Sequence, residues 1–409
     1  MLFRLVYFVF LVVSLLYPTT LILGPISIRH LLSIVVLGLC VYERGLHLDR
    51  FLKWYFGFLF FYTFIEVVTG YSSYIFPKLL GTYFASISLY LATKIMIEKY
   101  ETGSYIVYTL VALGFINAVE VIGQYFGSPI AIALPQILHI PMSEEDIELF
   151  IDSEPPMQYA GLMGIVNSGY FLSATSIMAL YNPNNKISIF NWIAFAIIFF
   201  ALFLVQERSG LIFGLMCVCL YLTFYSFQNK NSLITTTFIF IVASLFISNF
   251  LLEHLSIEDM RYTSAGMDDT RRIDNAINAL KWIINYPAGG AHYFYKMGGY
   301  YPHNFFLNAL LYGGIIGGSI LIGILFMQIL KIGKVIYSYL RNDDHSPLLI
   351  VCCFAYLCYT LNSFLHNYSL VLGGEMIFML WAMIGSLYDE ENEFLNEENC
   401  DLEEIETQN

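Results

Sequence analysis

Arginine and histidine side chains stand at three places in this 409-residue chain where apolar segments begin or end. Arg208 lies in "VQERSGLIFG", Arg271 and Arg272 lie in "DDTRRIDNAINALKWIINYPAGG", and His303 follows a proline at the head of "YYPHNFFLNALLYGGIIGG". Guanidinium groups bind phosphate oxygens in bidentate fashion. Histidine has an unperturbed pKa of about 6.5, so its imidazole can accept a proton near neutral pH. Phosphate binding and proton transfer are therefore the chemistry to test.

Each of these residues also has a structural interpretation. Arg208 can pair with its neighbour Glu207, and Arg271 and Arg272 can pair with nearby acids. Those acids are Asp268, Asp269 and Asp274. His303 can be an ordinary residue at a helix start, satisfied by the backbone or by water. The local sequence leaves both interpretations open.

Composition and the length of the apolar blocks predict the elements that carry these residues. The chain is 58% hydrophobic and only 12% charged, whereas a soluble domain carries about 25% charged residues. Its apolar residues come in blocks of about 20, the length of a membrane-spanning helix. We therefore predict an all-α polytopic membrane protein with about twelve transmembrane helices. The predicted spans are 2–17, 22–42, 52–69, 79–97, 105–126, 161–181, 190–206, 209–227, 232–252, 303–330, 347–365 and 369–388.

The distribution of basic residues predicts the orientation, because lysine and arginine favour the cytoplasmic side. With the N-terminus inside, the cytoplasmic segments hold eleven basic residues and the outer connections hold seven. Both termini are then cytoplasmic, and two long loops, about 127–160 and 253–302, lie outside. Residues 1–388 form the membrane domain. Residues 389–409 hold ten acidic and no basic side chains, which predicts a disordered cytoplasmic tail and argues against nucleic acid as a partner.

The second long loop contains a segment with the signals of a helix. Asp269 or Thr270 is expected to cap this helix, and Pro287 with two glycines is expected to stop it. Arg271 and Arg272 then fall in the first turn, beside free backbone N–H groups that also attract phosphate. Apolar residues recur at helical spacing, so we expect this stripe to face the membrane domain. The stripe comprises Ile273, Ala276, Ile277, Leu280, Ile283 and Ile284.

Acidic residues inside predicted spans are costly to bury, so we expect them to be paired. They are Glu66, Glu120 and Glu375, and the candidate partners are Arg29 and Lys78. The run "GGIIGG" at the end of the histidine-bearing stretch favours close helix packing, because small residues let two backbones approach.

Three of these stretches together resemble the O-antigen polymerase and O-antigen ligase superfamily. They are "ERSGLIFGL", "RIDNAINALKWIINYPAGG" and "YYPHNFFLNALLYGGIIGG", and they occur in the order found in the family. Members are bacterial membrane glycosyltransferases with a large outer loop before the histidine-bearing helix. The resemblance implies a GT-C-like arrangement in the bacterial inner membrane, with a large extracytoplasmic loop before the tenth predicted span.

The resemblance also assigns the two arginines. Arg208 matches the family's arginine at the start of a helix that opens with small residues. Arg272 lies fifteen residues before Pro287, the family's distance, which selects it over Arg271. The resemblance thus implies that Arg208 and Arg272 bind pyrophosphate, with Arg271 as a supporting residue. The chain departs from the family at Tyr312, where an acidic residue is common.

His303 and Asn304 match the family's histidine–asparagine pair at the opening of the next span. His366 repeats this pair in "SFLHNYSL" and is a candidate for a supporting role, as is Asn304. Gly314 and Gly317 match the family's paired glycines. The resemblance therefore implies His303 as the catalytic residue.

Family members transfer a glycan from a polyprenyl pyrophosphate to a sugar hydroxyl. Fixed cations can stabilise the charge on the leaving pyrophosphate, so the resemblance implies no metal and no cofactor. His303 is then the base for the acceptor hydroxyl. The implied partners are an undecaprenyl-pyrophosphate-linked oligosaccharide, an acceptor glycan or glycolipid, membrane lipids and a chain-length regulator.

Three functions stay open at this point. The first is a polymerase for O-antigen or capsular polysaccharide, which "PHNFFLNALLYGG" favours. The second is a ligase that transfers the finished glycan to lipid A–core. The third is a transporter or flippase, which is expected to carry inverted repeats and broken spans around a midplane site. We find no convincing repeat, and the candidate charges cluster at the predicted outer edge.

Overall fold

The computed structural model describes residues 1–16, 21–23, 26–45, 48–71, 79–138, 159, 161–163, 165–184, 186–205, 208–228, 267–300, 302, 304–342, 346–365, 371 and 374–390. The first half of the chain forms α1 (Leu2–Leu16), β1 (Leu21–Leu23), β2 (Ile26–Ser27), α2 (Ile28–Arg44), α3 (Arg50–Val68), α5 (Phe84–Glu98), α6 (Gly103–Tyr125) and α7 (Pro129–Leu138). A π-helical turn, Leu79–Tyr83, leads into α5. The second half forms α9 (Ile165–Ala179), α10 (Ile189–Val205), α11 (Arg208–Gln228), α13 (Met267–Asn285), α14 (Ala291–Lys296), α15 (Phe305–Asn342), α16 (Pro347–Leu365) and a last helix over 375–390.

Among the described residues, five helices are long and apolar enough to cross a membrane, judged by length and composition. They are Arg50–Val68, Gly103–Tyr125, Ser209–Ser226, Phe305–Arg341 and Pro347–Phe364. Leu2–Leu16 and Ile189–Val205 are shorter apolar helices. The prediction of an apolar, helical, membrane-type protein is confirmed to this extent, and the number of twelve crossings stays a prediction.

The helices lie close to the predicted spans, with local differences. A described helix overlaps eleven of the twelve spans, and the span predicted at 232–252 lies outside the described residues. The antiparallel pair β1–β2 occupies the start of the predicted span 22–42, so α2 begins only at Ile28. The helix α7 starts the outer loop predicted at 127–160. The last helix extends to residue 390, and the rest of the acidic tail lies outside the described residues.

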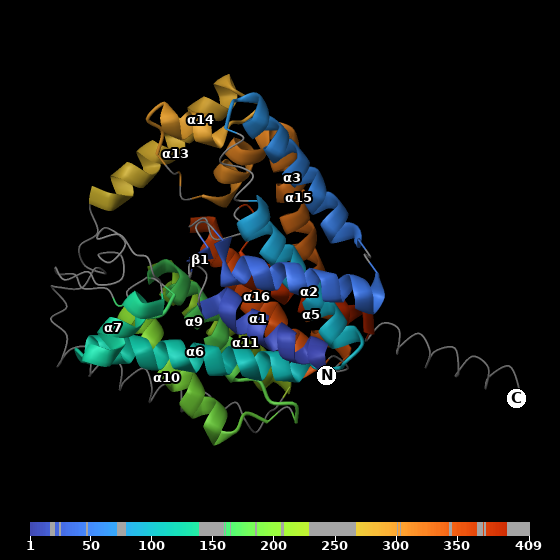
Figure 1. The fold of residues 1–409 in the computed structure, drawn as a ribbon. Helices are drawn as coiled ribbons and strands as arrows, with labels where there is room; N and C mark the ends of the chain where they lie inside the picture. The colour runs from blue at the N-terminus through green and yellow to red at the C-terminus, as the bar shows by residue number, and fades with distance from the viewer. Residues whose placement is uncertain are drawn as a thin grey trace, which may run out of the picture.

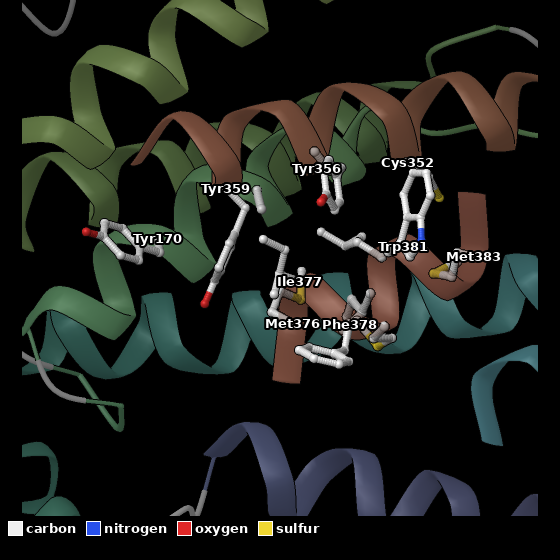
Figure 2. Close-up of a cluster of buried hydrophobic side chains, with 14 of the residues drawn as sticks. Tyr170, Cys352, Tyr356, Tyr359, Met376, Ile377, Phe378, Trp381 and Met383 are labelled. Carbon is white, nitrogen blue, oxygen red and sulfur yellow. The ribbon is translucent and has the colours of Figure 1, made fainter. Parts of the chain in front are cut away.

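The core between α16 and the last helix is packed from aromatic, branched and sulfur-containing side chains, as Figure 2 shows. Tyr356, Phe378 and Met383 are completely buried. The rings of Tyr356 and Trp381 lie with their centroids 5.8 Å apart. Within a membrane such a core is held by close packing rather than by the exclusion of water.

The two ends of α3 have different surroundings. At its start, Asp49 caps the helix and accepts from Lys94 Nζ at 3.0 Å, near a second ion pair between Arg44 and Glu98. At its other end, Glu66 contacts α14, about 24 Å further along the helix. Figure 1 shows α13 and α14 together at that end, beside the ends of α3 and α15. A bilayer core is about 30 Å thick, so the two ends of α3 are far enough apart to lie near opposite faces of a membrane, and the orientation stays a prediction.

Candidate functional site

The helix predicted in the second long loop is α13. It ends at Asn285, two residues before Pro287, so the predicted stop is confirmed. It begins at Met267, whereas Asp269 and Thr270 were the predicted caps. These two residues lie inside the helix, and the predicted start is therefore wrong by about one turn.

The earlier start of α13 changes the position of its arginines. Arg271 and Arg272 are the fifth and sixth residues of the helix, and free backbone N–H groups belong to the first four. The prediction that they fall in the first turn is wrong. Their side chains lie outside the described residues, as does that of Arg208, the first residue of α11. Pyrophosphate binding by Arg208 and Arg272 stays a prediction.

The helix α13 buries a different face from the one predicted. Ala279 and Ile283 are buried, whereas most of the predicted apolar stripe is exposed. The exposed members are Ile273, Ile277, Leu280 and Ile284. The small side chain of Ala279 suits a close approach to α15, which α13 contacts. At the end of apolar spans, an exposed apolar stripe suits the lipid–water interface, so the prediction that the stripe packs on the protein is wrong for these four of its six members.

The helix α15 is broken at Gly314, where the backbone has φ 63° and ψ −173°. This conformation is open essentially to glycine alone. The turn after α13, residues 287–290, fills the break. The Gly290 N–H donates to the Leu311 carbonyl at 2.9 Å, and the Ile315 N–H donates to the Pro287 carbonyl at 2.9 Å. Backbone groups that the break would leave unpaired are thus satisfied by the turn.

The backbones of α15 and of the turn after α13 lie too close together to leave room for side chains. A Cβ atom at Gly289 would lie 2.7 Å from the Gly314 nitrogen, and one at Gly314 would lie 2.8 Å from the Ala288 carbonyl carbon. A Cβ atom at Gly317 would lie 2.8 Å from Phe61 Cβ of α3. The predicted role of "GGIIGG" in close packing is confirmed, and its partners are α3 and the turn after α13.

The break folds the start of α15 back along the rest of the helix. The ring centroids of Phe306 and Phe326 lie 6.5 Å apart, whereas twenty residues of continuous helix would separate them by about 30 Å. A Cβ atom at Gly318 would lie 2.7 Å from the Ala309 carbonyl oxygen. Residues 305–313 therefore form a short arm against residues 315–342. The prediction of one continuous span over 303–330 is wrong.

A buried carboxylate ties α14 to α3. Glu66 is fully buried, and its Oε2 lies 2.9 Å from Nδ1 of His292. Tyr71 stacks on the His292 ring, with the centroids 5.9 Å apart. His292 lies in α14, directly after the turn that follows α13. The turn is therefore held to α3 through His292 and to the break in α15 through its own backbone.

The predicted partners of the intramembrane acids are partly confirmed. Arg29, one of the two candidate partners, pairs with Glu375: its Nη1 lies 2.5 Å from Glu375 Oε1. Glu66 pairs instead with His292, which is 226 residues away and carries no local signal of this contact. Glu120 Oε1 is buried and has no hydrogen-bond partner among the described residues. Lys78 lies outside the described residues.

Asn304 caps the start of α15. Its Oδ1 accepts from the Leu307 N–H at 3.1 Å, and its carbonyl accepts from the Asn308 N–H at 3.0 Å. Asparagine is among the best capping residues, so the cap accounts for Asn304 without a substrate contact. His303 directly precedes this cap and lies outside the described residues. Its role as the base stays a prediction.

Aromatic contacts join the start of α15 to the end of α16. Phe305 and Phe306 both contact Phe364, with ring centroids 6.4 and 5.4 Å apart. His366 follows two residues after Phe364 and lies outside the described residues. The described residues that neighbour His303 and His366 in the chain therefore meet where α15 begins and α16 ends.

The start of α11 packs near the end of α16 by way of α9. Asn362 Nδ2 of α16 donates to Ser173 Oγ of α9 at 3.1 Å. A Cβ atom at Gly214 of α11 would lie 3.1 Å from Ser173 Cβ. Gly214 comes six residues after Arg208, about 9 Å along the helix. The start of α11 and the start of α15 therefore both lie near the end of α16.

A pocket of about 270 Å³ lies between α13 and α14. It is lined by Asn278, Lys281, Trp282, Asn285, Phe294, Met297, Gly298 and Gly299. The Trp282 Nε1–H is buried and has no acceptor among the described residues. Amide groups beside an indole ring offer both hydrogen bonds and an apolar face, which together suit a sugar. The sequence carries no local signal of this pocket, because the turn between α13 and α14 brings the two helices together.

Among the described residues, no group of three or more His, Cys, Asp or Glu side chains could hold a metal ion. Comparison of the chain with protein-family models, with curated proteins and with solved structures finds no match. The assignment of a function therefore depends on the site itself and on the three motifs.

Proposed function

We propose that the protein is a membrane glycosyltransferase that polymerises O-antigen or capsular repeat units at the outer face of a bacterial inner membrane. It transfers glycan from undecaprenyl pyrophosphate to a sugar hydroxyl, and both of its termini are cytoplasmic. The observation that carries the proposal is the docking of residues 287–290 into the break of α15. This contact joins the helix that bears Arg272 to the helix that follows His303.

Two further observations support the same function. The start of α11, which bears Arg208, packs through α9 near the end of α16. The pocket between α13 and α14 presents Trp282 and two asparagines at the predicted outer end. The helices α13 and α15 contact each other directly, and α11 contacts α9 and α16, so segments far apart in the sequence are linked through shared neighbours.

The chemistry needs a base and two fixed cations. The acceptor hydroxyl oxygen attacks the anomeric carbon of the donor while His303 accepts the hydroxyl proton. The bond between that carbon and the pyrophosphate oxygen breaks, and the leaving group takes the electron pair. Arg208 and Arg272 stabilise the charge that develops on the pyrophosphate.

A broken helix is also expected of a transporter. In transporters the unwound backbone lines a cavity for the substrate. Here the described groups on either side of Gly314 pair with the turn after α13. The break therefore serves as a joint between α15 and the outer helices, which favours the transferase over the transporter.

Deletion of the gene in its native host distinguishes the candidates, with the glycan analysed by gel. Lipid A–core that carries a single repeat unit is the expected result for a polymerase. Long chains retained on the carrier lipid would identify the ligase alternative. An unchanged glycan would exclude both functions.

Complementation of the deletion strain tests the site. His303→Ala should lower the transfer rate by about 10² to 10⁴, the usual effect of removing a general base. Arg272→Lys should lose most activity, because lysine cannot make bidentate contacts, whereas the matched variant Arg271→Lys should be milder. Full glycan output from Arg272→Ala at a normal protein level would contradict the proposal.

A further inference from the structure

A second pocket, of about 330 Å³, lies at the other end of α3. It is about 24 Å from the contact between Glu66 and α14, so it shares no residue with the proposed transfer site. The helices α3, α5 and α15 and the last helix all contribute to it. One wall is apolar and is formed by Phe51, Trp54, Ile324 and Met327.

The charged groups of this pocket leave one cation without a counter-ion. Three basic and two acidic side chains line it. Lys94 Nζ lies 3.0 Å from Asp49 Oδ2, and Lys331 Nζ lies 3.5 Å from Asp389 Oδ1. Arg50 is exposed and makes no ion pair with any described residue. Its guanidinium group is therefore available for an anion.

A buried amide in the same pocket lacks an acceptor. Gln328 is 1% exposed and lines the pocket. Its Oε1 accepts from the Tyr356 hydroxyl, which orients the amide; Figure 2 shows Tyr356 in the adjoining core. Its Nε2 is buried and has no hydrogen-bond partner among the described residues. A buried donor without an acceptor is unfavourable, so the pocket is suited to an acceptor that comes from a ligand.

We propose that this pocket binds the phosphate of a membrane phospholipid, with Arg50 and Gln328 as its donors. Arginine binds phosphate in bidentate fashion, and an amide N–H donates readily to a charged oxygen. The apolar wall suits the acyl chains, because Trp54 and Met327 are 46% and 43% exposed on the flank of α3 and α15.

The position of the pocket favours a lipid over a soluble phosphate compound. It lies where α3 begins, and the start of a membrane span coincides with the level of lipid head groups. Trp54 and Trp381 line it, and tryptophan is enriched at that level. A soluble compound would have no use for the exposed apolar wall. The bound lipid joins four helices at this end of the molecule.

Lipid binding can be measured by native mass spectrometry of the purified full chain in detergent. Three probes separate the parts of the ligand: phosphatidylglycerol, diacylglycerol with the same chains, and soluble glycerol phosphate. We expect phosphatidylglycerol to bind at least about tenfold more tightly than either of the others, because only it offers both phosphate and chains. Equal binding of diacylglycerol would exclude the phosphate contact, and equal binding of glycerol phosphate would exclude the lipid.

Variants at the two donors complete the test. Arg50→Gln and Gln328→Leu should each weaken phosphatidylglycerol binding about tenfold, the effect of losing a hydrogen bond to a charged group. Lys53→Gln is the matched control, because Lys53 is an exposed base on the same turn that does not line the pocket. If Gln328→Leu does not fold, lipid binding by Arg50→Gln still tests the proposal, because Arg50 is exposed and its substitution is not expected to disturb folding. Equal lipid affinity of Arg50→Gln and Lys53→Gln would overturn the proposal.

Discussion

The joint between α15 and the turn after α13 can be tested by adding a single methyl group. In Gly314→Ala the methyl group would point into the turn, 2.8 Å from the Ala288 carbonyl carbon. In Gly323→Ala, on the same helix, the new Cβ atom would meet nothing within 4 Å. The two variants therefore make the same chemical change, and only the first one disturbs the joint.

The expected effect on the docking of the turn is about 3–5 kcal/mol. A residue other than glycine at φ 63° and ψ −173° costs about 1–3 kcal/mol. The turn must also move away from the new methyl group, which breaks the two backbone hydrogen bonds at Gly290 and Ile315. Each of these bonds contributes about 1 kcal/mol. Gly323→Ala should instead stabilise the helix by about 0.5–1 kcal/mol.

Hydrogen exchange of the purified protein in detergent measures this difference directly. In Gly314→Ala the amides of Gly290 and Ile315 should exchange at least about 10²-fold faster, since each 1.4 kcal/mol corresponds to a factor of ten. Gly323→Ala should leave both amides protected. If Gly314→Ala exchanges and melts like Gly323→Ala, then the turn is not held by the break, and the main support for the proposed function is lost.

The same preparation allows three smaller tests. His292→Ala leaves the buried Glu66 carboxylate without the His292 imidazole and should lower the free energy of unfolding by about 3–5 kcal/mol. The double variant with His292→Ala and Glu66→Gln should recover part of the lost stability. Burial raises the pKa of the Asp49 carboxyl, but hydrogen bonds from a backbone N–H, a tyrosine and a lysine outweigh burial and lower that pKa. The contribution of the Asp49 carboxylate to the stability of the folded protein is complete above the unfolded pKa of about 3.9 and is lost as the pH falls through the lower folded pKa. The melting temperatures of Asp49→Asn and the parent protein should therefore differ at pH 7 and converge in acid. A difference in melting temperature that does not change with pH would contradict this. Trp282→Phe keeps an aromatic ring and removes the unpaired N–H, so it should weaken oligosaccharide binding about threefold to tenfold at an unchanged melting temperature, and unchanged affinity would exclude Trp282 as a sugar ligand.

Features with a local physical cause could be predicted from the sequence. The helices lie near the apolar blocks because each block is long enough to pair its own backbone within a membrane. The end of α13 was predicted because Pro287 cannot continue a helix. That Arg29 pairs with a buried acid could be expected from the cost of burying a lone charge in an apolar span, although which of the three acids it contacts could not.

Features that depend on distant segments could not be predicted. The break at Gly314 is stable because the turn at 287–290 supplies its hydrogen bonds, and a glycine pair alone does not reveal that partner. The buried face of α13 was assigned wrongly for a related reason. In a soluble protein the apolar stripe turns toward the core, whereas beside a membrane it can face lipid. The small residue Ala279 is on the buried face of α13, and a small side chain suits close helix packing.

The fold of α15 changes the expected position of the proposed chemistry. In a continuous span, the residues that open the helix would lie at the membrane surface. Because residues 305–313 fold back from Gly314, the cap at Asn304 lies about 13 Å along the helix from the Gly314 end. The start of a helix carries free N–H groups and a partial positive charge, which attract anions. A site there suits a pyrophosphate held by a membrane lipid, since the carrier can reach it from within the bilayer while the glycan extends outward.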